Sequence, residues 1–591
     1  MNGFIPEPLG PVLEAVVTCP RTALVESWYR DSKGRWCLCF RATLSVEPTA
    51  FMPQESEWYL VVEAEAPRPK ITLYPSVQGG ISCTFPHQAA NLPGPPGSSW
   101  RLGNPCVERP EASFKRDDSS GEPRELGDRL LWRVERLLDW LDAAACDALL
   151  LDGDPLELPS FNVTTTPVLG FSETLEDFAD WSPWIGRWGF AATAALKGAR
   201  DHRQVLRFMS NDGQLVKEGS SVRVEADRPA DAIWVMLPHM PVIEPWQSPE
   251  TWKELSGFFI SCGLDLADIF RQAGQDKRKT RVKPTTRLLI GFPLSEKVGL
   301  APNRVHWIAA DNLGLSKNDT IRNGFRPSER NRVQWDVGKA TSLERIGWIK
   351  TSNWSSDQLR TRGGAEEEVA SKRVLIIGAG AIGSAVAENL ARSGVRDIGV
   401  IDNDILEVGN LSRHTLGLSD CGHGKAERLA ARLDDVAPDV VSTPFKDNFP
   451  PSEPRTVALV RKYDVVIDCT GSDAVLVALS EFDWSGEKRF VSLSIGWGAK
   501  EFFCYSASEA RFPALDALDR FGKNISYRPD LSTANREGVG CWHPVFPATA
   551  DDIQLWSAIG VKFARRAILE GARSCKIYRI ADDGTVAVVD G

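Results

Sequence analysis

Long apolar runs and an excess of basic residues are both missing from this 591-residue sequence. No apolar stretch approaches the roughly 20 residues that a membrane-spanning helix needs, and residues 1–10 lack the basic and then apolar pattern of a signal peptide. We therefore expect a cytoplasmic protein. With 69 Lys and Arg against 79 Asp and Glu, the net charge is −10, which argues against nucleic-acid binding as the main task.

Paired cysteines are also missing. The chain has 12 cysteines, none of them in a CxxC pair, which removes a structural zinc site of the paired-cysteine type. In a reducing compartment we expect most of these thiols to be buried and to act as small apolar side chains.

The length predicts three or four domains, because one hydrophobic core rarely serves more than about 250 residues. We divide the chain into residues 1–160, 161–364 and 365–591. The overall class is α/β: an α+β first domain, a mixed second domain that links the other two, and a Rossmann-like third domain that binds a nucleotide.

The third domain contains a glycine motif between a strand and a helix. An apolar run at Val374 to Ile377 predicts a buried strand, and a helical pattern follows the motif. A second apolar strand ends at Asp402, where a dinucleotide fold places its ribose-binding acid. This order predicts a phosphate held by glycine backbone and a helix amino terminus. The motif residues are Gly378, Gly380 and Gly383.

Taken alone, this motif would favour a nicotinamide or flavin enzyme. Two cations follow Asp402, however: Arg413 comes three residues after Asn410, and Lys425 lies further along the chain. Hydride transfer does not need these cations. An enzyme that attacks nucleotide phosphates does, because negative charge on the phosphoryl oxygens must be met by fixed positive charge.

The blocks D-x-D, N-L-x-R, G-K-A and D-C-T occur in this order. Over about residues 371–570 they make the chain resemble the adenylation domain of the ubiquitin-activating and ThiF/MoeB family. The resemblance implies that ATP converts a protein's carboxyl terminus into an acyl-adenylate. It assigns the ribose to Asp402, the orientation of ATP to Asn410 and Arg413, and contact with the phosphates to Lys425.

The resemblance also implies a magnesium ion (Mg) beside the ATP. Members of the family commonly have a metal-binding Asp three residues after the position of Asp468, and this chain has Gly471 there. Asp468, which also counts among the predicted cofactor-binding residues, and Asp473 are the candidate metal ligands instead.

The first domain resembles a ubiquitin-conjugating fold, because strand-like stretches at 36–44, 58–64 and 71–75 precede a proline-rich loop and a helix at 127–145. In such a fold a loop cysteine accepts the acyl group, and Cys106 is the candidate. The His-Pro-Asn tripeptide of eukaryotic members is missing. His87 and Asn91 either polarise the thioester in its place or only stabilise a turn. We interpret Cys37, Cys39 and Cys146 as structural.

The middle domain is rich in tryptophan and strand-like stretches, and it has no cluster of convergent polar motifs. By position it resembles the linker or inactive adenylation half of larger activating enzymes. Arg360 and Arg362 lie at its end. One of them reaches a partner subunit's ATP site, as in dimeric members of the family, or both are solvated boundary residues.

Two glycines, Gly538 and Gly540, precede Cys541 in a long polar segment. Thioester-forming members of the family keep their cysteine in such a crossover segment, and His543 could lower the thiol pKa or move a proton. The alternative is a buried cysteine that packs beside Trp542.

These resemblances favour a fused activating and conjugating enzyme. It would adenylate a protein carboxylate, pass the acyl group from Cys541 to Cys106 and then to an amine, and work as a homodimer. The domain order resembles that of the fused proteins of type II CBASS antiphage operons, which implies the carboxyl terminus of a cGAS-like nucleotidyltransferase as substrate. The alternatives are a bacterial ubiquitin-like protein as substrate, or a sulfur-carrier adenylyltransferase. A nicotinamide-binding scaffold conflicts with Arg413 and Lys425.

Overall fold

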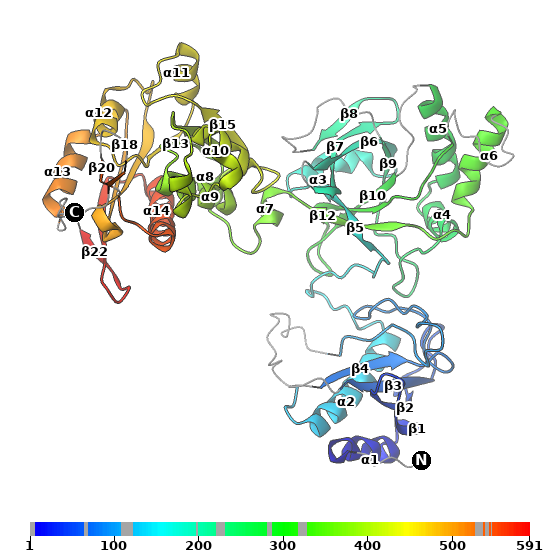
Figure 1. Cartoon of the computed structure of the whole chain (residues 1–591). Coiled ribbons are helices and arrows are strands. Elements are labelled where there is room, and N and C mark those ends of the chain that lie inside the picture. Colours follow the sequence, from blue (N-terminus) through cyan, green and yellow to red (C-terminus); the bar gives the residue numbers. More distant parts are fainter. Residues whose placement is uncertain are drawn as a thin grey trace. The chain divides into compact units, whose positions relative to one another are not determined.

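The computed structural model describes residues 6–63, 69–107, 122–196, 199–219, 231–279, 287–316, 328–525, 536–537, 543–544 and 546–590 (Figure 1). The described residues form two compact units. The first unit extends to Asn353, and the second begins at Trp354, upstream of the boundary predicted after Gly364.

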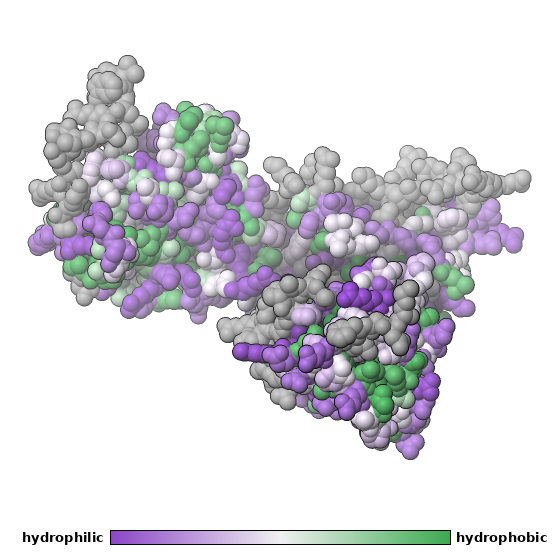
Figure 2. Space-filling view, turned by 60° about the horizontal axis from the view of Figure 1, so that its bottom comes forward, coloured by the Kyte–Doolittle hydropathy of each residue, from purple (hydrophilic) through white to green (hydrophobic). Residues whose placement is uncertain are grey.

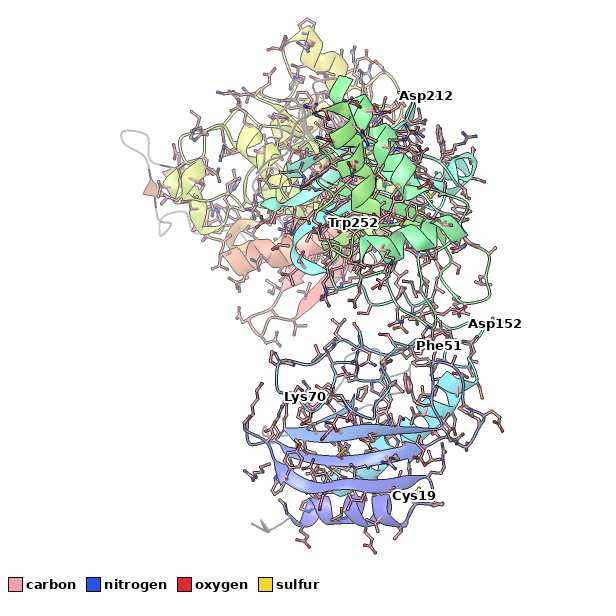
Figure 3. All side chains as sticks on the ribbon, turned by 90° about the vertical axis from the view of Figure 1, so that its right-hand side faces the viewer. Cys19, Phe51, Lys70, Asp152, Asp212 and Trp252 are labelled. Carbon is pink, nitrogen blue, oxygen red and sulfur yellow. The ribbon has the colours of Figure 1, made fainter. Side chains whose placement is uncertain are left out.

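The first unit begins with a four-stranded antiparallel sheet in the order β1-β2-β3-β4, with its strands side by side in Figure 3. Consecutive strands pair antiparallel in this meander, and a helix follows the loop after β4. The strands and the helix confirm the predicted order. The elements are η1 (Glu7–Leu9), α1 (Gly10–Thr18), β1 (Thr22–Arg30), β2 (Trp36–Thr43), β3 (Glu55–Glu63), β4 (Lys70–Pro75) and α2 (Leu126–Ala145).

The two faces of this sheet are covered differently. Alternation in β2 puts Leu38 and Phe40 in a core with α2, where Leu130, Leu137 and their neighbours are spaced to share one helix face. Cys37 and Cys39 point to the opposite face. There they pack with Tyr59, Val61 and Trp100, and Trp100 comes from the loop after β4.

The same unit continues with an eight-stranded sheet in the order β5-β12-β11-β10-β9-β6-β7-β8. An additional parallel pairing between β5 and β7 closes seven of these strands on themselves. The strands are β5 (Thr164–Phe171), β6 (Trp188–Leu196), β7 (Ala199–Ser210), β8 (Leu215–Glu218), β9 (Ala232–Met236), β10 (Arg287–Leu294), β11 (Arg304–Ala310) and β12 (Trp348–Asn353).

Alternation along β9 separates two cores. Trp234 packs inside the closed sheet with Trp181, Trp307 and residues from each of the seven strands. Ile233 and Val235 face outward and pack against helices. The helices are α3 (Asp177–Trp181), η3 (Ser182–Trp184), α4 (Trp252–Ser261), α5 (Leu266–Lys279) and α6 (Glu329–Ala340).

The second unit has an eight-stranded sheet in the order β15-β14-β13-β16-β17-β18-β21-β22. The strands from β15 to β17 pair in parallel, and β17, β18, β21 and β22 pair antiparallel. The strands are β13 (Arg373–Ile377), β14 (Asp397–Ile401), β15 (Val441–Phe445), β16 (Val465–Asp468), β17 (Lys488–Ile495), β18 (Glu501–Glu509), β21 (Ser574–Ile580) and β22 (Val586–Asp590), with a separate pair β19 (Arg536–Glu537) and β20 (His543–Pro544).

Helices cover both faces of this sheet. One core includes residues of α9, α10 and α14, and the other includes residues of α11, α12 and α13. This is the predicted Rossmann-like arrangement. The helices are α7 (Ser356–Leu359), α8 (Glu367–Ala370), α9 (Ala381–Ser393), η4 (Val408–Ser412), η5 (Leu418–Asp420), α10 (Lys425–Asp434), α11 (Pro454–Val460), α12 (Asp473–Glu481), η6 (Trp497–Ala499), α13 (Ala514–Asn524) and α14 (Ala550–Glu570).

Hydrophilic side chains cover much of the face seen in Figure 2, and apolar side chains form patches between them. Within the described part of the chain, none of the helices has the length and apolar character needed to cross a membrane.

Candidate active site

The predicted glycine turn connects β13 to α9. Gly378 has φ +88°, a conformation that other residues rarely adopt. A Cβ atom on Gly383 would lie 1.8 Å from the carbonyl oxygen of Gly378, so the first turn of α9 packs directly on the loop. Gly380 is the N-cap of α9. The backbone N–H groups that begin this helix therefore have no preceding helical partners and can bind an anion.

Both backbone polar groups of Ala379, in the middle of this turn, are hydrogen-bonded. Its N–H donates to Oδ2 of Asp402 over 2.7 Å, and its carbonyl oxygen lies 2.7 Å from Nε2 of His414. The other oxygen of Asp402 accepts from the N–H of Asp404 over 2.8 Å. Asp402, predicted for the ribose, thus also fixes the glycine loop.

A cavity of about 360 Å³ opens at the carboxyl ends of β13, β16 and β17. It brings together the glycine loop and three of the predicted side chains, while Asp402 and Asp468 are not among its lining residues. Sequence reasoning missed His414, whose one signal is its place directly after Arg413. The lining residues are Gly380, Ala381, Ile382, Asn410, Arg413, His414, Lys425, Cys469, Thr470, Gly471, Leu493, Ser494, Ile495, Phe546 and Ile553.

The polar residues of the cavity are held by the segment between β14 and α10. Asn410 accepts from the N–H of Glu407 over 3.1 Å. Nη1 of Arg413 donates to the carbonyl oxygen of Phe546. Lys425, at the start of α10, places its ammonium 2.9 Å from the carboxylate of Asp404. Both cations keep further donors with which to bind phosphate oxygens.

Asp468 has a different environment from the one predicted for a metal ligand. It is 1% exposed, and its oxygens accept from Oγ1 of Thr470 over 2.7 Å and from Oγ of Ser492 over 3.1 Å. Burial raises the pKa of its carboxyl group, although these hydrogen bonds oppose the shift. This geometry suits a residue that positions Thr470 at the edge of the cavity.

Asp473 is exposed at the start of α12 and does not line the cavity. Within the described ranges, no group of three or more His, Cys, Asp and Glu side chains could hold a metal ion. A magnesium ion bound with a nucleotide usually takes one or two carboxylates and otherwise phosphate and water. The donor set here does not identify those carboxylates, so no step is assigned to a metal.

Two cysteines of this unit lie at the core: Cys504 is buried within it, and Cys469 packs against it where it lines the cavity. Burial raises the pKa of Cys469 and of Cys504 well above the ordinary thiol value, so both are protonated at neutral pH. Cys541, the predicted acyl acceptor, lies outside the described residues, between β19 and β20 in the sequence.

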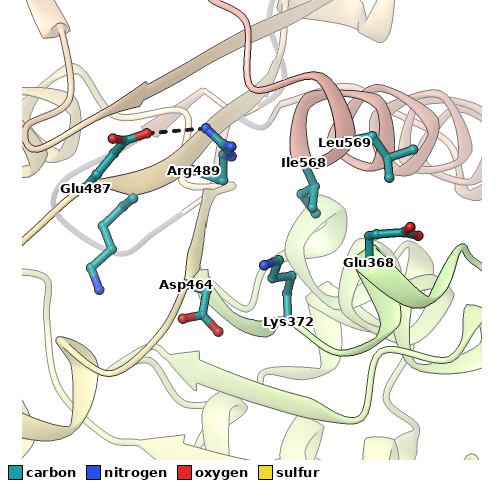
Figure 4. A pocket seen from close by; sticks show the side chains of 8 residues that line it. Glu368, Lys372, Asp464, Glu487, Arg489, Ile568 and Leu569 are labelled. Carbon is teal, nitrogen blue, oxygen red and sulfur yellow. Dashed lines mark hydrogen bonds and ion pairs between the residues drawn. The ribbon is translucent and has the colours of Figure 1, made fainter.

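A second cavity of about 370 Å³ lies at the amino ends of β13, β16 and β17, the sheet edge opposite to the first cavity (Figure 4). Its charged side chains are of both signs, and Arg489 pairs with Glu487 at 3.4 Å. It contains no glycine turn, and Glu368 in the first turn of the short helix α8 adds negative charge to it. The lining residues are Glu368, Lys372, Asp464, Glu487, Lys488, Arg489, Ile568 and Leu569.

The two boundary arginines differ. The guanidinium of Arg360 forms two hydrogen bonds to the carboxylate of Asp439, of 2.6 and 2.9 Å, and both side chains are at most 10% exposed. Both alternatives predicted for Arg360 are therefore wrong as stated. Its guanidinium is not solvated, and it cannot reach a partner subunit's ATP site without breaking this buried pair. Arg362 is exposed.

In the first unit, Cys106 is exposed on the loop between β4 and α2, as predicted. Its backbone N–H donates to the carbonyl oxygen of His87 over 2.6 Å, and its neighbour Val107 is buried. The imidazole of His87 lies 3.0 Å from the carboxylate of Glu157. The hydrogen bond to His87 and the burial of Val107 therefore fix the backbone at Cys106, while its side chain stays exposed.

Asn91 is buried and its amide is fully used inside the loop. Nδ2 donates to the carbonyl oxygens of Ile81 and Cys83 over 2.8 and 2.9 Å, and Oδ1 accepts from Nε of Arg101 over 3.1 Å. Of the two predicted roles, this geometry favours stabilisation of a turn. Cys37 and Cys39 are buried, as a structural role requires. Cys146 is instead exposed just after α2, so it is not part of the core.

A Rossmann-like sheet, a glycine turn at a helix amino terminus and two cations at one cavity define an ATP-dependent adenylating enzyme of the ThiF type. Comparison with known families agrees: residues 356–497 match the ThiF family, and residues 147–354 match the Cap2 central linker domain.

One relative is similar to this chain over nearly its whole length. The ATP-dependent ubiquitin transferase-like protein Cap2 of Enterobacter hormaechei is 44% identical over 586 residues, which cover 98% of each chain. This chain belongs to the Cap2 family and is an adenylating transferase. The molybdopterin-synthase adenylyltransferase of Escherichia coli is 32% identical over 27% of this chain and 64% of its own. The crystal structure of E. coli MccB with ATP aligns over 38% of this chain and 65% of its own, with 16% identity and a TM-score of 0.28.

Proposed function

We propose that the chain adenylates the carboxyl terminus of a protein and transfers the acyl group through two of its own cysteines. The cavity at the glycine turn carries this proposal, because it combines a helix amino terminus with Arg413 and Lys425. In the first step the substrate carboxylate attacks the α-phosphorus of ATP, which gives an acyl-adenylate and pyrophosphate. The two cations and the helix dipole stabilise the negative charge that develops on the phosphates.

Asn410, Asp402 and Asp468 have supporting roles in this proposal, and Asn410 orients the ATP together with Arg413. Asp402 holds the loop through Ala379 and retains lone pairs for a ribose hydroxyl, since each of its oxygens accepts one backbone N–H. Asp468 orients Thr470 at the cavity edge. Magnesium accompanies the ATP in this proposal, with Asp473 an exposed candidate ligand.

The next three steps move the acyl group. The thiolate of Cys541 attacks the acyl carbonyl, forms a thioester and releases AMP. The thiolate of Cys106 then displaces Cys541 from the thioester, and Cys541 recovers its proton. Finally an amine attacks the carbonyl, an amide forms, and Cys106 returns to the thiol state. An exposed position on an anchored loop supports Cys106 as the last carrier.

We propose that residues 1–160 form the conjugating part, 161–364 a linker, and 365–591 the adenylating part, and that two chains pair through the adenylating part. The proposed substrate is the carboxyl terminus of a cGAS-like nucleotidyltransferase in antiviral defence, with a bacterial ubiquitin-like protein as the alternative. A sulfur-carrier adenylyltransferase would not need the exposed Cys106. Substrate-dependent exchange of pyrophosphate into ATP tests the adenylation step directly.

A further inference from the structure

The imidazole of His414 connects the segment after β14 to the glycine turn. Its Nε2 lies 2.7 Å from the carbonyl oxygen of Ala379, and its Nδ1 accepts from the N–H of Leu416 over 3.1 Å. Since Nδ1 acts as an acceptor, the proton of the neutral ring is on Nε2 and is donated to Ala379. Both ring nitrogens are therefore used by backbone groups.

This contact completes a clamp around one residue, Ala379. Asp402 accepts the N–H of Ala379, and His414 donates to its carbonyl group. The flanking residues Gly378 and Gly380 have wide conformational freedom, so they do not fix the orientation of the turn by themselves. Two side chains from outside the turn supply that restraint.

We propose that His414, in its neutral form, is a positioning residue that holds the glycine turn in the conformation that binds the nucleotide phosphates. This inference rests on the proposed ATP site. His414 lines the same cavity as Arg413 and Lys425. It acts through the backbone of Ala379, which precedes the N-cap of α9. Losing the bond would loosen the turn and weaken binding of ATP without removing a charge from the site.

The surroundings of His414 favour the neutral ring. Burial lowers its pKa below the ordinary histidine value of about 6.5. Lys425 also disfavours the charged form, while Asp402, Asp420 and the carbonyl of Ala379 favour it; burial prevails. Protonation would place an N–H at Nδ1 against the N–H of Leu416, so the clamp should fail as the pH falls below the lowered pKa of the ring.

Two substitutions separate the two bonds. In His414→Gln the side-chain amide can still donate to Ala379, whereas in His414→Asn the shorter amide reaches Leu416 but not Ala379. We expect His414→Asn to raise the KM for ATP in pyrophosphate exchange, and the Kd for ATP in calorimetry, by roughly fivefold with little change in kcat. His414→Gln should stay within about twofold of the wild type. His423→Gln, an exposed histidine on the same segment, is the matched control.

The pH profile gives a second readout. As the pH falls below about 6.5 and through the lowered pKa of the ring, the wild type should lose ATP affinity more steeply than His414→Gln, because the variant has no titrating ring. This comparison remains decisive if His414→Asn does not fold, which a thermal melt would reveal.

The outcomes are distinct. Wild-type affinity in His414→Asn, or parallel pH profiles in the wild type and His414→Gln, would overturn the role of His414. A wild-type protein that neither binds ATP nor exchanges pyrophosphate would instead contradict the proposed function of the cavity.

Discussion

The ammonium nitrogen of Lys425 lies 2.9 Å from a carboxylate oxygen of Asp404. The two partners differ in environment: the side chain of Lys425 is 12% exposed, and that of Asp404 is 73% exposed. The backbone joins the same pair, since the N–H of Lys425 donates to the carbonyl oxygen of Asp404 over 2.9 Å. The lysine is thus oriented at the start of α10 before any phosphate binds.

We predict that Lys425→Ala lowers pyrophosphate exchange by about 100-fold, because the cavity loses a cation that meets phosphate charge in the transition state. Asp404→Asn should cost less than about tenfold, since it only loosens the orientation of the lysine. Lys523→Ala, which removes an exposed lysine on α13, is the control. An Asp404→Asn variant as impaired as Lys425→Ala would mean that the carboxylate itself contacts the nucleotide.

Arg413→Ala should also abolish most pyrophosphate exchange, by about 100-fold, while leaving the fold intact. The hydrogen bond from Arg413 to Phe546 ties the guanidinium to the cavity wall, so its loss affects the site more than the core. Arg432→Ala, whose guanidinium pairs with Glu388 away from the cavity, is the matched control. Exchange that survives Arg413→Ala, or tighter binding of NAD than of ATP, would reject the assignment.

Asn91→Ala should lower the stability of the first unit by about 2–3 kcal/mol, because it leaves the buried partners of one amide without hydrogen bonds. Chemical denaturation measures this change. Gln78→Ala removes an exposed amide nearby and should have little effect. If Asn91→Ala kept its stability but stopped acyl discharge from Cys106, the alternative role in polarising the thioester would be correct.

We predict that the chain is a homodimer, because adenylation domains of this type pair to complete their sites. Light scattering should give twice the chain mass at micromolar concentration. The buried pair of Arg360 with Asp439 leaves Arg362 as the boundary arginine that can reach a partner, so Arg362→Ala should lower exchange without affecting the mass. A monomer that still adenylates would contradict this prediction.

The glycine turn was predictable from sequence because strand, turn and helix are contiguous there. Local sterics also require glycine at two positions: Gly378 has a positive φ, and a side chain on Gly383 would collide with the carbonyl oxygen of Gly378. The nearby cations were predictable for a similar reason: Arg413 and Lys425 follow at short range on the same connection. Such local patterns predict structure well, because all the residues that determine the turn lie within one short segment of the sequence.

Long-range contacts were not predictable in this way. Arg360 reads as a boundary residue until Asp439, 79 positions away, is placed beside it. His414 belongs to no motif, and its role depends on the approach of Ala379 from another element. The burial of Asp468 follows from its place in the sheet and from the side chains of Thr470 and Ser492, and the D-C-T block does not reveal it.

The transfer of an acyl group through two cysteines is the central claim, and the reason for it is chemical. An acyl-adenylate is labile to water, whereas a thioester keeps the acyl group activated in a form that can leave the ATP site. Loss of Cys541 and loss of Cys106 should therefore stop the reaction at different stages.

The most direct test is mass spectrometry without reducing agent on Cys541→Ala and Cys106→Ala, each incubated with ATP and the protein substrate. Cys541→Ala should retain pyrophosphate exchange and show no reducible adduct. Cys106→Ala should show a thiol-sensitive adduct on Cys541 and no amide product. An adduct on any other cysteine, or full conjugation by Cys106→Ala, would contradict the relay.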